Sequence, residues 1–115
     1  MGPTTEKRPW GSYTVLCEGP GYKVKKVSVS PGQRLSYQFH SRRQEHWMLV
    51  EGVATITLEG KEYRLEVGLT FNVPMGARHR LANASTIPMT IIEVQRGDYT
   101  GEDDIVRLDD DFGRS

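Results

Sequence analysis

The sequence has one cysteine, no long hydrophobic run and no net charge, and each of these features excludes a class of protein. With Cys17 alone, an internal disulfide framework is impossible, and the chain fits a reducing compartment. No apolar segment approaches the roughly 20 residues that a membrane-spanning helix needs. The formal net charge is zero, which gives no overall attraction to nucleic acid or an anionic membrane. We therefore expect a cytoplasmic protein without nucleic-acid or membrane partners, in which Cys17 is a small core residue.

The sequence also lacks any helical pattern longer than a turn or two. Its 12 glycines and 6 prolines separate short segments typical of β-strands. The clearest segment, residues 53–58, alternates apolar residues with threonines, as a half-buried strand does. Further strands are expected up to Cys17 and at 22–30, 34–40, 46–50, 62–65, 69–73, 79–83 and 88–95. Short strands at this spacing predict an all-β fold, an antiparallel sandwich or barrel such as a double-sheet jelly roll.

The length of 115 residues and the 37% of hydrophobic residues fit one globular domain. We expect residues 1–7 to form a disordered lead and residues 8–115 to form this domain. Within the strand at 22–30, Val24 has the opposite parity to Val27 and Val29. This mismatch indicates a bulge or a two-sided strand near residues 25–26.

Candidate metal ligands lie in the segment 38–45, with a further histidine later in the chain. In an extended strand, Gln38 and His40 point to the same face because side chains alternate. Glu45 follows after a short turn, and His79 begins a later strand. Two imidazoles, a carboxylate and an amide oxygen suit a divalent Zn, Co, Mn, Ni or Fe ion, and the ligand types do not choose among these metals. Alternatively, both histidines are ordinary polar residues of strands.

The spacing of two stretches resembles the paired motifs of the cupins. The first contains Gly32, Gln38, His40, Glu45 and Gly52, and the second contains Gly68, Pro74, Gly76, His79 and Asn83. Gln38 stands where many cupins have histidine. The segments 38–47 and 92–95 and the tail 97–114 further resemble the type II mannose-6-phosphate isomerase domain, in which this glutamine is expected. The resemblance implies a cupin double-stranded β-helix, which is a jelly-roll barrel.

The resemblance also implies a metal-dependent isomerase that interconverts mannose 6-phosphate and fructose 6-phosphate. In many members the domain follows a mannose-1-phosphate guanylyltransferase, which has no counterpart in this sequence, so guanylyl transfer is not expected. Isomerisation moves a proton between adjacent carbons while an oxyanion develops, and a metal ion can stabilise that charge. Glu93 is the candidate catalytic base because it shares its strand parity with Gln95. Its alternative role is to pair with a nearby arginine.

A sugar-phosphate ligand requires cations, and arginine offers a planar fork for phosphate oxygens. Arg43 is the first candidate because it lies inside the metal motif and matches an arginine of the isomerase pattern. We predict a catalytic and a substrate-binding role for it. The other predicted substrate-binding residues are Lys26, Arg80 and Arg107. The lysines at 23–26 also fit a solvated strand face.

Two other functions remain open at this point. Two histidines and a carboxylate also form the facial triad of Fe(II)-dependent oxygenases, although Gln38 and the isomerase-like tail count against that reading. A non-catalytic sugar-binding cupin is the other alternative, because a fold does not by itself specify a function. Small jelly rolls have exposed strand edges that a second copy can cover, so we expect a homodimer.

Overall fold

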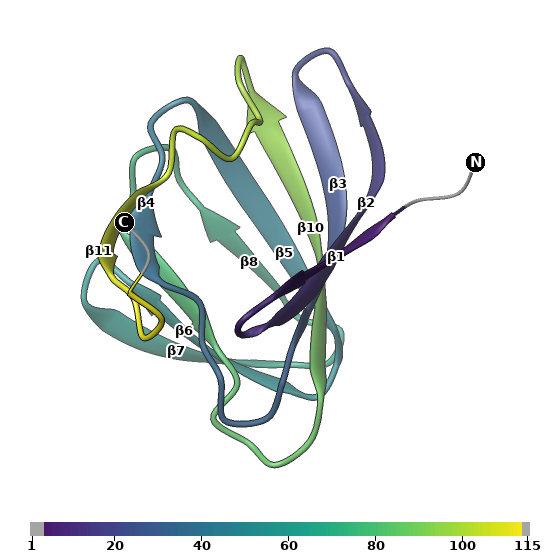
Figure 1. Cartoon of the computed structure of the whole chain (residues 1–115), viewed down its shortest axis with the longest axis vertical. Helices are drawn as coiled ribbons and strands as arrows, with labels where there is room; N and C mark the ends of the chain where they lie inside the picture. Colours follow the sequence, from purple (N-terminus) through teal and green to yellow (C-terminus); the bar gives the residue numbers. More distant parts are fainter. Residues whose placement is uncertain (1–3, 114–115) are drawn as a thin grey trace.

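The computed structural model describes residues 4–113, which form eleven strands and no helix. The prediction of an all-β protein is therefore confirmed. The strands run antiparallel in two sheets that face each other and enclose the interior (Figure 1). They are β1 (Thr5–Arg8), β2 (Gly11–Gly19), β3 (Tyr22–Val29), β4 (Tyr37–Phe39), β5 (Arg43–Glu51), β6 (Val53–Leu58), β7 (Lys61–Glu66), β8 (Thr70–Val73), β9 (His79–Ala82), β10 (Met89–Gly97) and β11 (Val106–Asp109).

The order of the strands brings distant parts of the chain together. The larger sheet has the order β1-β2-β3-β10-β5-β8, and the smaller has β11-β4-β9-β6-β7. The last long strand, β10, thus lies between β3 and β5 and pairs with both along most of its length. In the second sheet, β4 and β9 are neighbours, and the Cα atoms of Gln38 and His79 face each other. These pairings unite the two motif stretches of the sequence.

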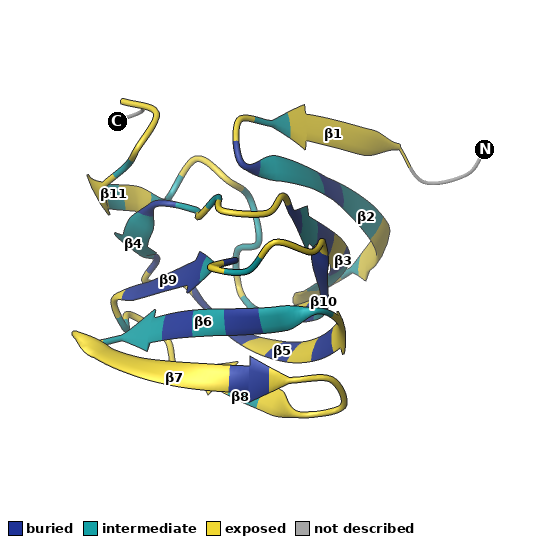
Figure 2. Ribbon diagram, turned by 90° about the horizontal axis from the view of Figure 1, so that it is seen from below, coloured by how far each residue is buried: buried dark blue, intermediate teal, exposed yellow. Residues whose placement is uncertain are grey.

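Alternation along the strands divides the interior into an apolar and a polar end. On β10, Met89 and Ile91 face inward near one end, and Glu93 and Gln95 continue the same face toward the other. The neighbouring strands β3 and β5 change in the same way, from buried valine, leucine and tryptophan to buried lysine, glutamate and arginine. Figure 2 shows β9 mostly buried and β6 alternating between buried and intermediate, whereas the edge strand β7 is mostly exposed. The apolar end is the core, and the polar end is available for a site.

The structure differs from the sequence-based expectations in several places. Residues 5–7, expected to be disordered, belong to β1, and residues 1–3 lie outside the described part of the chain. Strand β11 was not anticipated. Strand β3 is regular, and the irregularity lies in its partner β2, between Val15 and Cys17. Beyond this bulge Cys17 is exposed, so its expected place in the core is wrong.

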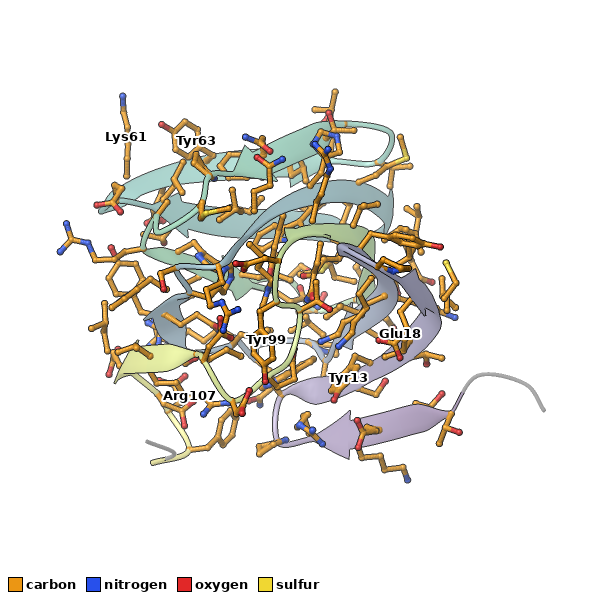
Figure 3. The ribbon with its side chains drawn as sticks, turned by 90° about the horizontal axis from the view of Figure 1, so that it is seen from above. Tyr13, Glu18, Lys61, Tyr63, Tyr99 and Arg107 are labelled. Atoms are coloured by element: carbon orange, nitrogen blue, oxygen red, sulfur yellow. The ribbon has the colours of Figure 1, made fainter. Side chains whose placement is uncertain are left out.

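Lys61 and Tyr63 project outward from β7 at the edge of the smaller sheet (Figure 3). The same view looks onto the segment 98–105, which contains Tyr99 and connects β10 to β11 across one end of the barrel.

Across residues 4–113 the structure contains no helix long and apolar enough to cross a membrane.

Gly52 provides a test of how the β5–β6 turn is built. Its φ is +82°, and an added Cβ would meet the carbonyl oxygen of Pro88 and lie 3.0 Å from Met89 Cα. We expect Gly52→Ala to lower the free energy of unfolding by about 1–3 kcal/mol, measured by urea denaturation. Gly60→Ala is the matched control, since its φ is +80° but nothing lies within 4 Å of the added Cβ. Equal losses in the two variants would contradict the close approach at Gly52.

Candidate metal centre and cavity

His40, Glu45 and His79 meet at the polar end of the barrel. His40 follows β4, Glu45 lies on β5 and His79 begins β9, so three elements from both sheets supply the cluster. Their ligand atoms lie within 4.8 Å of one another, and all three residues are buried. His40 Nε2 is 3.0 Å from Glu45 Oε2. The structure thus brings three of the four predicted metal ligands into one compact group.

The electrostatics of this group suit a bound cation. Burial lowers the pKa of His79, which keeps its imidazole neutral and its lone pair available. Its Nδ1 lies 2.9 Å from the carbonyl oxygen of Ala77, an arrangement in which Nδ1–H donates and Nε2 is left as the ligand atom. Although burial opposes the charge of Glu45, the neighbouring His40, His79 and Arg43 hold its pKa well below the usual range.

Among the described residues, neither ring nitrogen of His40 has a hydrogen-bond partner, although the side chain is 1% exposed. The contact between His40 Nε2 and Glu45 Oε2 is close but not aligned as a hydrogen bond. Burying a polar atom without a hydrogen-bond partner costs free energy, and a metal ion bound at His40 Nε2 would compensate for that cost. The residues present therefore fit a divalent metal ion.

Gln38, the fourth predicted ligand, is the cross-strand neighbour of His79 in the β4–β9 pairing, and both residues line one cavity. Gln38 Nε2 donates a 3.0 Å hydrogen bond to Ser36 Oγ. This bond orients the amide and leaves Oε1 as the atom able to face a cation. Its ligation of a metal remains a prediction.

Glu45 is held by two buried side chains of its own strand. Arg43 Nε donates to Glu45 Oε2, and Trp47 Nε1 donates to Glu45 Oε1, each at 3.0 Å. Because side chains two apart share a face of β5, this support follows from the strand itself. Arg43 Nη1 also donates to the carbonyl oxygen of Gly101 at 2.8 Å. Nε and Nη1 of Arg43 are thus engaged by the protein, which leaves Nη2 as the guanidinium nitrogen available to the phosphate of a ligand.

Glu93 is buried on the inward face of β10 together with Gln95, as their shared parity predicted. Gln95 Nε2 donates a 2.6 Å hydrogen bond to Glu93 Oε2. Burial, reinforced by the nearby carboxylate of Glu45, raises the pKa of Glu93 well above the usual range. Gln95 Oε1 is buried and has no hydrogen-bond partner among the described residues. The centre therefore combines a buried carboxyl group of raised pKa with an unused acceptor.

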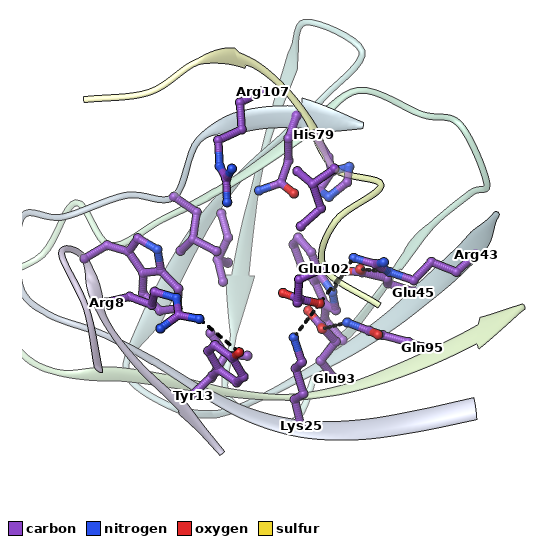
Figure 4. A pocket seen from close by; sticks show the side chains of 17 residues that line it. Arg8, Tyr13, Lys25, Arg43, Glu45, His79, Glu93, Gln95, Glu102 and Arg107 are labelled. Carbon is purple, nitrogen blue, oxygen red and sulfur yellow. Dashed lines mark hydrogen bonds and ion pairs between the residues drawn. The ribbon is translucent and has the colours of Figure 1, made fainter. Parts of the chain in front are cut away.

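A cavity with about 640 Å³ of space, counted to its solvent-open mouth, is lined by polar residues of this centre: Gln38, Glu45, His79, Glu93 and Gln95. Figure 4 shows Arg43, Glu45, Glu93 and Gln95 together on one side, with Arg8 and Tyr13 on the other. The cationic lining residues are Arg8, Lys25, Arg43 and Arg107. Arg107 was predicted to bind substrate, and its position on the cavity wall is consistent with that role.

The structure does not bring the other two predicted cations to the cavity. Lys26 is exposed on the outer face of β3, and its neighbour Lys25 is inside, with the parity of Val27. The parity shared with Val27 was the sequence signal that Lys25 points inward. It was missed because a lysine among other charged residues is usually solvated. Arg80 Nε donates to the carbonyl oxygen of Leu35, and its Nη2 donates to that of Asp109. Arg80 therefore ties β9 to the strand β11, which sequence reasoning had not anticipated.

Comparison with known proteins identifies the family. The family described as mannose-6-phosphate isomerase C-terminal matches residues 3–110. This chain belongs to that family. The alginate biosynthesis protein AlgA of Pseudomonas aeruginosa is 48% identical over 108 residues, which are 94% of this chain and 22% of AlgA. The mannose-1-phosphate guanylyltransferase ManC of Salmonella typhimurium is 44% identical over 107 residues, 93% of this chain and 22% of ManC. The chain thus spans about a fifth of these relatives.

Solved structures support the cupin fold. The capsular polysaccharide assembling protein CapF of Staphylococcus aureus superposes with a TM-score of 0.83 at 19% identity, over 93% of this chain and 34% of CapF. The cupin domain of Cnp3 from Schizosaccharomyces pombe gives 0.72 at 13% identity, over 83% of this chain and 69% of that chain. The predicted cupin jelly-roll barrel is confirmed, and the family assignment and the fold agree.

Proposed function

We propose that this mannose-6-phosphate isomerase family domain is a metal-dependent enzyme that interconverts mannose 6-phosphate and fructose 6-phosphate. The observation that carries this proposal is that Glu93 is buried near the Glu45 carboxylate and lines one cavity together with Glu45 and His79, two members of the candidate metal cluster. Aldose–ketose isomerisation needs a base next to a centre that stabilises an oxyanion. The family membership supports the same reaction.

His40, Glu45, His79 and Gln38 are the residues that would hold the divalent ion. Such an ion supplies Lewis-acid polarisation of the carbonyl and hydroxyl oxygens of the substrate. The buried hydrogen bonds from Arg43 and Trp47 fix the Glu45 carboxylate in the orientation that ligation requires. Zn, Co, Mn, Ni and Fe(II) all accept this mixture of nitrogen and oxygen ligands.

Glu93 moves the proton in this proposal. Its carboxylate takes a proton from carbon 2 of the open-chain aldose and returns it to carbon 1, while a proton passes from oxygen 2 to oxygen 1. The base is regenerated, and no atom is gained or lost. The raised pKa of Glu93 makes its carboxylate a better proton acceptor than an exposed glutamate. The unused Gln95 Oε1 can accept a hydrogen bond from a sugar hydroxyl.

A coupled assay for fructose 6-phosphate tests this function. We expect metal-stripped protein to be inactive toward mannose 6-phosphate, and at least one of Zn, Co, Mn, Ni or Fe(II) to restore turnover. Metal binding without turnover under every condition would overturn the isomerase and favour a sugar-binding cupin. Oxygen consumption with Fe(II) would instead indicate an oxygenase.

We also propose that the protein is a cytoplasmic homodimer. Its ligand in this proposal is a small sugar phosphate. The outer face of the larger sheet supports a dimer, because Met48, Val50 and Val94 are exposed there on the neighbouring strands β5 and β10. Contiguous exposed apolar side chains are typical of interaction surfaces.

A further inference from the structure

The Lys25 ammonium and the Glu102 carboxylate form an ion pair at the mouth of the cavity. Lys25 Nζ lies 2.9 Å from Glu102 Oε2, and Arg43 Nη2 lies 3.9 Å from the same oxygen. The side chains of the two cations are only 5% and 2% exposed, whereas that of Glu102 is 40% exposed. One carboxylate oxygen therefore occupies the point where two buried cations converge, and it reaches that point from the solvent side.

The two cations are fixed by the larger sheet. Lys25 lies opposite Glu93 in the β3–β10 pairing, and Arg43 lies opposite Gly97 in the β5–β10 pairing. The Lys25 ammonium also sits 4.2 Å from the centre of the Tyr13 ring, a favourable cation–π distance. Burying two positive charges requires an anionic partner. Arg43 has carboxylate partners in Glu45 at 3.0 Å and Asp104 at 3.3 Å, whereas the ion pair of Lys25 is with Glu102.

Glu102 is the more exposed partner of this ion pair. Glu102 lies in the irregular segment 98–105. Two hydrogen bonds hold the backbone just before it. Lys23 Nζ donates to the carbonyl oxygen of Thr100 at 2.7 Å, and Arg43 Nη1 donates to that of Gly101 at 2.8 Å. The Glu102 side chain can therefore turn away to solvent by rotation about its own bonds while the segment stays in place. Figure 4 shows Lys25 reaching into the cavity toward Glu102.

We propose that Lys25 and Arg43 form the subsite for the phosphate group of the ligand, and that Glu102 holds this subsite in the free protein until a phosphate displaces it. This inference rests on the proposed function for the sugar part of the ligand. A phosphate oxygen at the position of Glu102 Oε2 lies within ion-pair distance of both cations. Phosphate brings more negative charge and more acceptor oxygens than one carboxylate, so it replaces Glu102 at the subsite.

The test measures binding of inorganic phosphate to the metal-free chain by titration calorimetry. Glu102→Gln keeps the size of the side chain and removes the competing charge, so we expect phosphate to bind about tenfold more tightly. Lys25→Met is expected to weaken phosphate binding about tenfold or more. The matched controls are Glu62→Gln on β7 and Lys26→Met, which change the net charge equally and lie on exposed surfaces. Thermal unfolding shows whether each variant folds.

Competition experiments distinguish binding of the phosphate group from binding of the sugar. Mannose 6-phosphate is expected to displace inorganic phosphate from the wild-type chain, and mannose at the same concentration is not. The inference is overturned if Glu102→Gln behaves like Glu62→Gln, if Lys25→Met behaves like Lys26→Met, or if no variant binds phosphate. Phosphate binding through Lys25 without turnover in the coupled assay would refute only the isomerase. Turnover with an unchanged KM in Lys25→Met would refute only the subsite.

Discussion

His79→Ala is expected to lower isomerase turnover by about a thousandfold or more and to reduce the content of bound divalent metal. His79 supplies a buried, neutral imidazole to the cluster with His40 and Glu45. Loss of the metal would remove several kcal/mol of oxyanion stabilisation, which corresponds to about this change in rate. The measurements are kcat in the coupled assay and metal content after dialysis.

His46→Ala is the matched control for this experiment. His46 is the third histidine of the chain, adjacent to Glu45, but it is exposed on the outer face of β5. We expect its loss to change neither metal content nor turnover by more than about twofold, as is usual for surface substitutions. If both variants lose activity equally, or if His79→Ala keeps its metal and its rate, the proposed centre is wrong.

Glu93→Gln is expected to lower kcat about 10²- to 10⁴-fold, with bound metal and KM nearly unchanged. The amide preserves the size of the side chain and can still hydrogen-bond to Gln95, but it cannot accept a proton from carbon. The loss therefore falls on the proton transfer and not on substrate binding. Single-turnover measurements with mannose 6-phosphate deuterated at carbon 2 check that the slow step is the proton transfer.

The control for this substitution is again Glu62→Gln, which removes an exposed carboxylate on the far edge of the smaller sheet. It is expected to leave kcat unchanged. Near-normal turnover in Glu93→Gln would remove Glu93 from the mechanism. Its buried carboxyl group would then be a structural partner of Gln95 and Lys25.

Most of the strands could be predicted from the sequence because their signals are local. The alternation at residues 53–58 and the glycine at position 52 mark strand and turn without reference to the rest of the chain. The spacing of His40, Glu45 and His79 likewise predicted that these three side chains meet, because the resemblance to the cupin motifs relates positions that are distant in the sequence. Strands β1 and β11 were missed because short, polar edge strands carry little local signal.

The environment of each charged side chain was decided by the tertiary structure. By itself the sequence determined an all-β domain of the mannose-6-phosphate isomerase family and the composition of its candidate metal cluster. Only the pairing of β10 with both β3 and β5 decided that Lys25 faces the cavity and that Lys26 faces solvent. Only the course of residues 98–105 decided that Arg43 is bound by Gly101 and faces Glu102. The physical reason is that burial and charge pairing depend on which distant strands become neighbours, and local alternation does not record that choice.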